Sequence, residues 1–175
     1  VYNGELYGFQ GLREELIRRG VSLRTTSDTE VLLEALVHLG VEPALDRVDG
    51  MFAFGLYDAR ERSLVLARDR FGIKPFYYSV DEHCMRFASN TRALLAAGDV
   101  SSAIDPVALH FQYTLHAVIP APRTILRDIR KLEPAHSLTI EAGGRPGVRR
   151  YWELDARRPQ AAHSEQDWVD QTRAA

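Results

Sequence analysis

Along the first fifty residues, a short strand pattern is followed by helical patterns. The apolar residues of Val1–Tyr7 predict a strand that is interrupted at Asn3-Gly4. Apolar side chains at helical spacing then predict three helices, over residues 12–20, 27–40 and 43–48. Glycines at the ends of the first two helical patterns are typical of helix C-termini.

After Gly50 the pattern changes to short apolar runs separated by polar turns. Such runs predict β-hairpins, here over residues 51–57 with 63–67, residues 76–80 with 85–89, and residues 136–140 with 148–154. Short helices are predicted at residues 90–97 and after Asp105-Pro106. Because hairpin-linked strands are antiparallel, the order predicts a layered α/β (α+β) fold rather than a doubly wound parallel sheet.

Composition is that of one compact domain with a real core, since the chain has 175 residues, 45% of them hydrophobic. The 22 basic and 24 acidic residues give a net charge of −2, which indicates neither a nucleic-acid nor an anionic-membrane partner. No apolar run approaches the roughly 20 residues of a membrane span. The single cysteine, Cys84, excludes an intrachain disulfide and fits a reducing, cytoplasmic setting.

Both ends of the chain suggest a piece of a longer protein. Val1 opens directly into strand-like sequence, and the last eight residues stop inside a helix-like pattern. From Asp155 onward the sequence is rich in Arg, Ala, Pro and Gln, which is typical of a linker. We therefore expect a domain over residues 1–154, and over residues 155–175 a linker with the start of a further, missing domain.

The first segment that suggests chemistry is Tyr2–Tyr7. The side-chain amide of Asn3 and the backbone N–H of Gly4 are two neutral donors that suit an oxyanion hole. A glycine within a strand also marks a bulge, or a place where another group approaches the backbone closely. On the local pattern alone, the structural interpretation is favoured.

The second segment is Ser27–Glu30. Ser at the N-cap with Glu three residues later is a capping box, which explains both residues without a function. Asp28 is not needed for that box, although a carboxylate in the first helical turn is favoured by the helix dipole. The functional alternative is that Asp28 holds the ammonium group of a substrate.

Other candidates favour structural roles. Around Gly72 and Pro75 a tight turn is predicted, with Asp69 pairing with nearby cations, and no glycine-rich loop supports a phosphate site. The six histidines lack zinc-ligand spacing, so no metal site is predicted. Cys84 lacks a nucleophile elbow and is expected to be a buried or half-buried spectator.

Taken in order, these motifs resemble the glutaminase domain of asparagine synthetases and other class II glutamine amidotransferases. The stretches that carry the resemblance are Tyr2–Tyr7, Ser27–Leu33, Gly50–Phe54 and Arg68–Pro75. Residues 119–125 and 129–134 look like the segment that leads toward a synthetase domain, which favours the asparagine synthetase branch. The resemblance extends to about Leu154.

The resemblance implies the four-layer αββα sandwich of N-terminal nucleophile hydrolases, incomplete at its N-terminus. In that family an N-terminal cysteine attacks the glutamine amide, with its own α-amine as the base. Asn3 and Gly4 would form the oxyanion hole, and Asn3, Gly4, Glu5 and Asp28 would hold glutamine. The nucleophile is expected before Val1, so the piece alone is expected to be inactive; Cys84 is internal and cannot replace it.

By the same resemblance, ammonia would pass to a covalently linked synthetase domain that amidates aspartate. ATP and Mg would belong to that domain, and residues 1–175 would hold no cofactor. Residues 114–118 are similar to the longer version in enzymes that amidate an N-acetylated glutaminylglutamine dipeptide, which leaves that acceptor as an alternative. A non-catalytic glutamine-binding or regulatory domain is a further alternative, and a homodimer is compatible with each of them.

Overall fold

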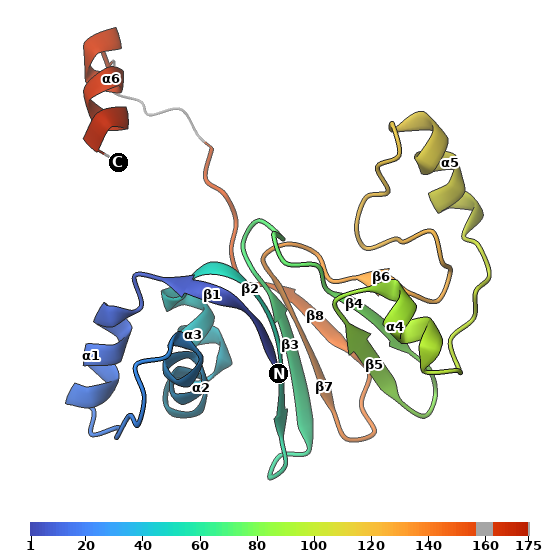
Figure 1. Cartoon of the computed structure of the whole chain (residues 1–175), viewed down its shortest axis with the longest axis horizontal. Helices are drawn as coiled ribbons and strands as arrows, with labels where there is room; N and C mark the ends of the chain where they lie inside the picture. The colour runs from blue at the N-terminus through green and yellow to red at the C-terminus, as the bar shows by residue number, and fades with distance from the viewer. Residues whose placement is uncertain (157–162, 175) are drawn as a thin grey trace.

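The computed structural model describes residues 1–156 and 163–174. Two antiparallel sheets lie face to face between helices (Figure 1). The first three helices cover the outer face of the larger sheet: α1 (Gln10–Arg18), α2 (Asp28–Leu39) and α3 (Val41–Arg47). On the smaller sheet the outer layer is α4 (Thr91–Ala96), so the predicted four-layer αββα arrangement is confirmed.

The larger sheet has the strand order β1-β2-β3-β7-β8 and the smaller sheet the order β5-β4-β6. Every pairing is antiparallel. The larger sheet contains β1 (Tyr2–Tyr7), β2 (Asp49–Asp58), β3 (Ser63–Arg68), β7 (His136–Glu141) and β8 (Gly147–Arg150). The smaller sheet contains β4 (Tyr77–Val80), β5 (Met85–Ala88) and β6 (Arg130–Lys131).

The core has two parts because side chains alternate across the larger sheet. On β2, Phe52 and Phe54 face the helices, whereas Ala53 faces the smaller sheet. The helix-side part includes Leu6, Leu16, Val31, Leu32 and Leu45. Between the sheets lie Leu66, Phe76, Leu132 and Leu138. This division fixes which face of β1 each of its side chains occupies.

The elements expected from the apolar pattern are present, but the predicted interruption of the first strand is wrong. β1 pairs with β2 without a break from Tyr2 opposite Phe54 to Tyr7 opposite Asp49, so Gly4 marks no bulge. Pairing along the long β2 outweighs the turn preference of Asn-Gly. β6 was not expected, since two residues show no periodicity.

The capping box at α2 is only half present. Ser27 caps the helix, and its hydroxyl accepts a hydrogen bond from the Thr29 N–H at 3.2 Å. Glu30 does not reach back to the Ser27 N–H; its oxygens accept from the N–H groups of Arg24 and Thr25, both at 2.7 Å. The loop before α2 folds onto Glu30, which a pattern within the helix cannot show.

Asp69 lies fully buried in the turn between β3 and β4, where cation pairing was predicted. Its oxygens instead accept three backbone N–H groups at 2.9–3.1 Å, those of Phe71, Ile73 and Lys74. The Arg68 guanidinium donates to three backbone carbonyls, those of Gly72, Lys74 and Leu132. The structural interpretation of this turn is therefore right, whereas the predicted partners of Asp69 are wrong.

The last helices are α5 (Pro106–Thr114), capped by the Asp105 side chain as expected, and α6 (Glu165–Ala174). Of the predicted linker at residues 155–175, positions 157–162 and 175 lie outside the described residues. α6 has no buried residue. In the part of the chain that the structure describes, no helix is both long enough and apolar enough to span a membrane.

Candidate functional site

The edge of β1 carries a row of outward-pointing backbone N–H groups. Just before the strand, Val1 and Gly55 exchange two hydrogen bonds of 2.9 Å. Antiparallel pairs alternate between hydrogen-bonded and non-hydrogen-bonded positions. The N–H groups of Tyr2, Gly4 and Leu6 therefore point away from β2. Among the described residues β1 is the terminal strand of its sheet, so this row faces an open edge.

Asp28, the first residue of α2, lies against this edge. Its Oδ2 atom accepts a hydrogen bond from the Leu6 N–H at 3.0 Å and another from the Tyr2 hydroxyl at 2.9 Å. The Ser27 cap holds the start of α2 in place, and Leu12, Leu16 and Leu32 pack the helices onto the sheet. The carboxylate is thereby fixed beside the β1 backbone.

The surroundings of Asp28 favour its charged form. Burial by itself would raise the pKa of this carboxyl group, but the hydrogen bonds from Leu6, Tyr2 and Thr29 outweigh burial and hold the pKa below its ordinary value. The hydroxyl contacts of the Oδ1 atom are longer than the hydrogen bonds of Oδ2, at 3.4 Å from Ser27 and 3.3 Å from Thr29. Oδ1 is therefore the oxygen that can accept a short hydrogen bond from a cation.

The side chains of Asn3 and Glu5 project to the other face of β1, away from Tyr2 and Leu6. Both are exposed. Asn3 lines a cavity of about 150 Å³ whose other walls include Pro75, Phe87 and Ser89. Thus the structure brings Asp28 against the β1 backbone on the helix side and leaves Asn3 on the side of the smaller sheet.

Gly4 lies between these two positions and allows a close approach of the two strands. A Cβ atom there would lie 2.3 Å from the Met51 carbonyl oxygen and 2.7 Å from the Phe52 Cα atom. Of the two structural interpretations of this glycine, close approach is therefore the correct one. Any side chain at this position would push β1 away from β2 and displace the outward N–H of residue 4.

Sequence reasoning missed the two donors that orient Asp28. Tyr2 and Leu6 share the helix-side face of β1 with Gly4, and their alternation was visible in the sequence. The register of β1 against β2, however, decides which N–H groups point outward. The start of α2 also has to reach the same edge, and neither fact follows from a local pattern.

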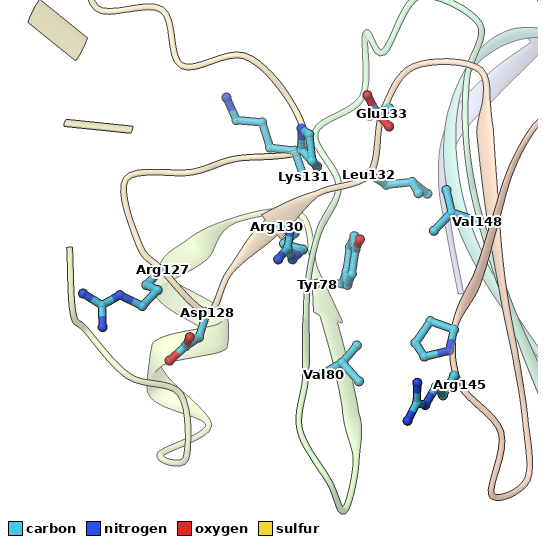
Figure 2. Close-up of a pocket in the computed structure, with 12 residues that line it drawn as sticks. Tyr78, Val80, Arg127, Asp128, Arg130, Lys131, Leu132, Glu133, Arg145 and Val148 are labelled. Atoms are coloured by element: carbon cyan, nitrogen blue, oxygen red, sulfur yellow. The ribbon is translucent and has the colours of Figure 1, made fainter. Parts of the chain in front are cut away.

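A larger hollow lies elsewhere. This cleft has a volume of about 590 Å³. Tyr78 and Val80 of β4 lie on one side of it and Arg145 and Val148 on the other (Figure 2). Its charged lining residues are Arg127, Asp128, Arg130, Lys131, Glu133 and Arg145. None of the four residues predicted for glutamine lines it. It borders β8, at the opposite edge of the larger sheet from β1.

Cys84 is exposed, so the expectation of a buried or half-buried thiol is wrong. It lies in the polar turn between β4 and β5, where its Sγ atom is 3.6 Å from an Asp81 carboxylate oxygen. Partial desolvation raises the pKa of the thiol, and the nearby carboxylates add to this effect against the opposing charge of Arg86. Such a thiol is a weak nucleophile.

Within the described residues, no group of three or more His, Cys, Asp or Glu side chains is arranged to hold a metal ion.

A family model described as "Glutamine amidotransferase domain" matches residues 1–152. The chain belongs to this glutamine amidotransferase domain family. The domain is 36% identical to glutamine-hydrolyzing asparagine synthetase 3 of Bacillus subtilis (strain 168) over 156 residues, which cover 89% of the chain and 25% of the relative. It is 40% identical to asparagine synthetase 1 of the same organism over 145 residues, covering 82% of the chain and 22% of the relative.

The amidotransferase domain thus spans about a quarter of the length of these curated relatives. Among solved structures, it matches glutamine phosphoribosylpyrophosphate amidotransferase from B. subtilis with a TM-score of 0.59 and 20% identity. That match covers 88% of this chain and 29% of the solved chain. At this identity the match shows the fold alone.

Proposed function

We propose that this domain hydrolyses the side-chain amide of glutamine to glutamate and ammonia. We propose further that a linked ATP-dependent synthetase domain uses the ammonia to amidate aspartate. Membership of the amidotransferase family and the relatives named as glutamine-hydrolyzing asparagine synthetases support the proposal. The observation that carries it is the ionised Asp28 carboxylate beside the outward N–H row of β1.

The spacing along this edge suits glutamine. The Asp28 carboxylate accepts a hydrogen bond from the Leu6 N–H. The Gly4 N–H lies two residues along the same edge, about 7 Å from the Leu6 N–H. This is comparable with the distance between the α-ammonium and the amide oxygen of an extended glutamine. The ammonium would pair with Asp28 Oδ1 while the amide oxygen faces the Gly4 N–H. Glu5, between Gly4 and Leu6 on β1, would lie beside the bound glutamine.

The reaction itself requires a nucleophile and an oxyanion hole. We propose that a cysteine before Val1 attacks the amide carbon and that its α-amine accepts the thiol proton and delivers it to the departing ammonia. The Gly4 N–H and the Asn3 side-chain amide would stabilise the negative oxygen that forms during the attack. Water would then hydrolyse the thioester and release glutamate.

The acceptor of the ammonia is proposed from the relatives. Both Bacillus subtilis proteins are named asparagine synthetases, which favours aspartate over the dipeptide alternative. ATP and Mg would bind in the synthetase domain and not in residues 1–152. A cytoplasmic setting is proposed with this function, and the single cysteine is compatible with it.

The proposed glutamine site is tested by Asp28→Ala in the complete protein. Loss of a charge-assisted contact to the ammonium of about 2 kcal/mol should lower kcat/KM for glutamine by at least about thirtyfold. Synthesis from added ammonia should be unchanged, because the synthetase site does not use Asp28. Glu14→Ala, at an exposed position on α1, is the matched control and should change neither activity. Equal loss of both activities in the Asp28 variant would contradict the assignment.

The proposed nucleophile is tested by reading the coding sequence upstream of Val1. A frame that begins Met-Cys-Gly would supply the cysteine, and its replacement by Ala should abolish glutamine hydrolysis while sparing ammonia-dependent synthesis. A frame without a cysteine after the initiator would overturn hydrolysis. In that case a non-catalytic glutamine-binding domain would explain the same residues.

A further inference from the structure

We propose that Tyr2 is a positioning residue that sets the preference of the site for substrates with an α-ammonium group. Its hydroxyl orients the Asp28 carboxylate so that one oxygen stays directed at the ligand. This inference deepens the proposed function and rests on it. The evidence for its role is geometric.

Two donors converge on a single oxygen of Asp28. The Tyr2 hydroxyl lies 2.9 Å and the Leu6 N–H 3.0 Å from Oδ2. Together they fix the rotation of the carboxylate, which a single donor would leave free. The other oxygen, Oδ1, accepts longer hydroxyl contacts, at 3.4 Å from Ser27 and 3.3 Å from Thr29, and is the oxygen that we assign to a cation.

The tyrosine ring is itself held in place. Tyr2 packs against the helix-side core and stands opposite Phe54 in the register of β1 and β2. It borders a hollow of about 200 Å³ whose walls include Leu32 and Leu36 of α2. Burial raises the pKa of the hydroxyl, with the Asp28 bond adding to the effect, so the group stays a proton donor over the physiological range.

The two donors also bracket the proposed oxyanion donor. Tyr2 and Leu6 lie on either side of Gly4 on the same strand face. One short strand would therefore hold both the group that faces the amide oxygen and the groups that orient the partner of the α-ammonium. In this arrangement the distance between the two substrate contacts is set by β1 together with the start of α2, which carries Asp28. Tyr2 would thus act on substrate recognition and not on the chemical step.

The test compares two ligands that differ only in the α-ammonium group, L-glutamate and glutarate. Their dissociation constants are measured by calorimetry on the complete wild-type protein and on Tyr2→Phe. We expect the dissociation constant of glutamate to rise about fivefold to tenfold in the variant, since one hydrogen bond to a charged group is lost. That of glutarate and the kcat for glutamine should change by less than about twofold.

A matched control is available on the same strand. Tyr7→Phe removes a hydroxyl from a ring that is 51% exposed, and it should change neither dissociation constant. Tyr2→Phe retains the aromatic ring and its packing, so the variant is expected to fold. Its melting curve is recorded beside that of the wild type. If glutamate and glutarate weaken together, or if kcat falls with them, Tyr2 serves the structure of β1 and the inference is overturned.

Asp28→Asn separates failure of this inference from failure of the proposed function. If this variant keeps the wild-type preference for glutamate over glutarate, or if the wild type has none, the site assignment itself is wrong. If Asp28→Asn abolishes the preference while Tyr2→Phe retains it, only the positioning role of Tyr2 is wrong. Reduced preference in both variants supports both proposals.

Discussion

At the scale of single residues, the candidate site depends on backbone groups as much as on side chains. Asn3, Gly4, Glu5 and Asp28 were predicted from the family resemblance, and the structure places Asp28 against the strand that carries the other three. The orienting contact of Tyr2 was not predicted, because a hydrogen bond between residues 26 positions apart depends on tertiary packing. The sequence thus supplied candidate residues but not the tertiary contact that holds Asp28.

Gly4→Ala should damage both stability and the proposed site. The added Cβ would overlap the Met51 carbonyl oxygen and the Phe52 Cα, which are backbone atoms that cannot rotate away. We expect the free energy of unfolding to fall by about 2 kcal/mol, together with loss of glutamine-dependent activity. Urea denaturation measures the first effect. Gly11→Ala in α1, where the Cβ meets nothing within 4 Å, is the control and should stabilise by about 0.5–1 kcal/mol.

The Gly4 prediction has a clear contrary outcome. An unchanged urea midpoint in Gly4→Ala would mean that β1 shifts away from β2 at little cost. In that case the strand would not be rigid enough to set the spacing between the Gly4 N–H and Asp28. The argument from distance along the β1 edge would then fail, even if the residues still contact glutamine.

At the scale of elements, the apolar pattern was sufficient for the helices and the hairpins. The α1 to α3 region and the β2–β3 hairpin follow the expected periodicities, since each buries one face against a neighbour. The pattern was insufficient for β6 and for the continuity of β1, because those depend on pairing partners that are distant in sequence. The role of Glu30 in holding the loop before α2 was missed for the same reason.

The turn between β3 and β4 should be one of the most sensitive connections in the fold. Asp69 is fully buried and satisfies three backbone N–H groups, so Asp69→Ala would leave all three without that partner. We expect a loss of about 3 kcal/mol in the free energy of unfolding, measured by urea denaturation. Asp58→Ala, at the exposed end of β2 in the β2–β3 hairpin, is the control and should cost less than about 1 kcal/mol. Similar losses in both variants would show that the buried turn is readily rehydrated.

At the scale of the whole molecule, the sandwich leaves two unusual surfaces within the described residues. The first is the β1 edge, where the N–H groups of Tyr2, Gly4 and Leu6 point outward and that of Leu6 donates a hydrogen bond to Asp28. Around α5, several large apolar side chains are exposed: Val107, Leu109, Tyr113, Leu115 and Val118. Open strand edges and apolar patches both promote association between chains. Substitutions on each surface can show whether the β1 edge or the α5 surface contributes more to association.

We expect residues 1–175, expressed alone, to associate as concentration rises, chiefly through pairing of β1 edges. A lysine on an edge strand opposes such pairing, so Tyr7→Lys should shift the chain toward monomer. Tyr57→Lys is the matched control, because this 62% exposed ring lies on β2 opposite Leu64 of β3 and outside the β1 edge. Light scattering coupled to size-exclusion chromatography measures the mass. Should Val107→Lys disperse the chain while Tyr7→Lys does not, the α5 surface and not the strand edge would be the contact.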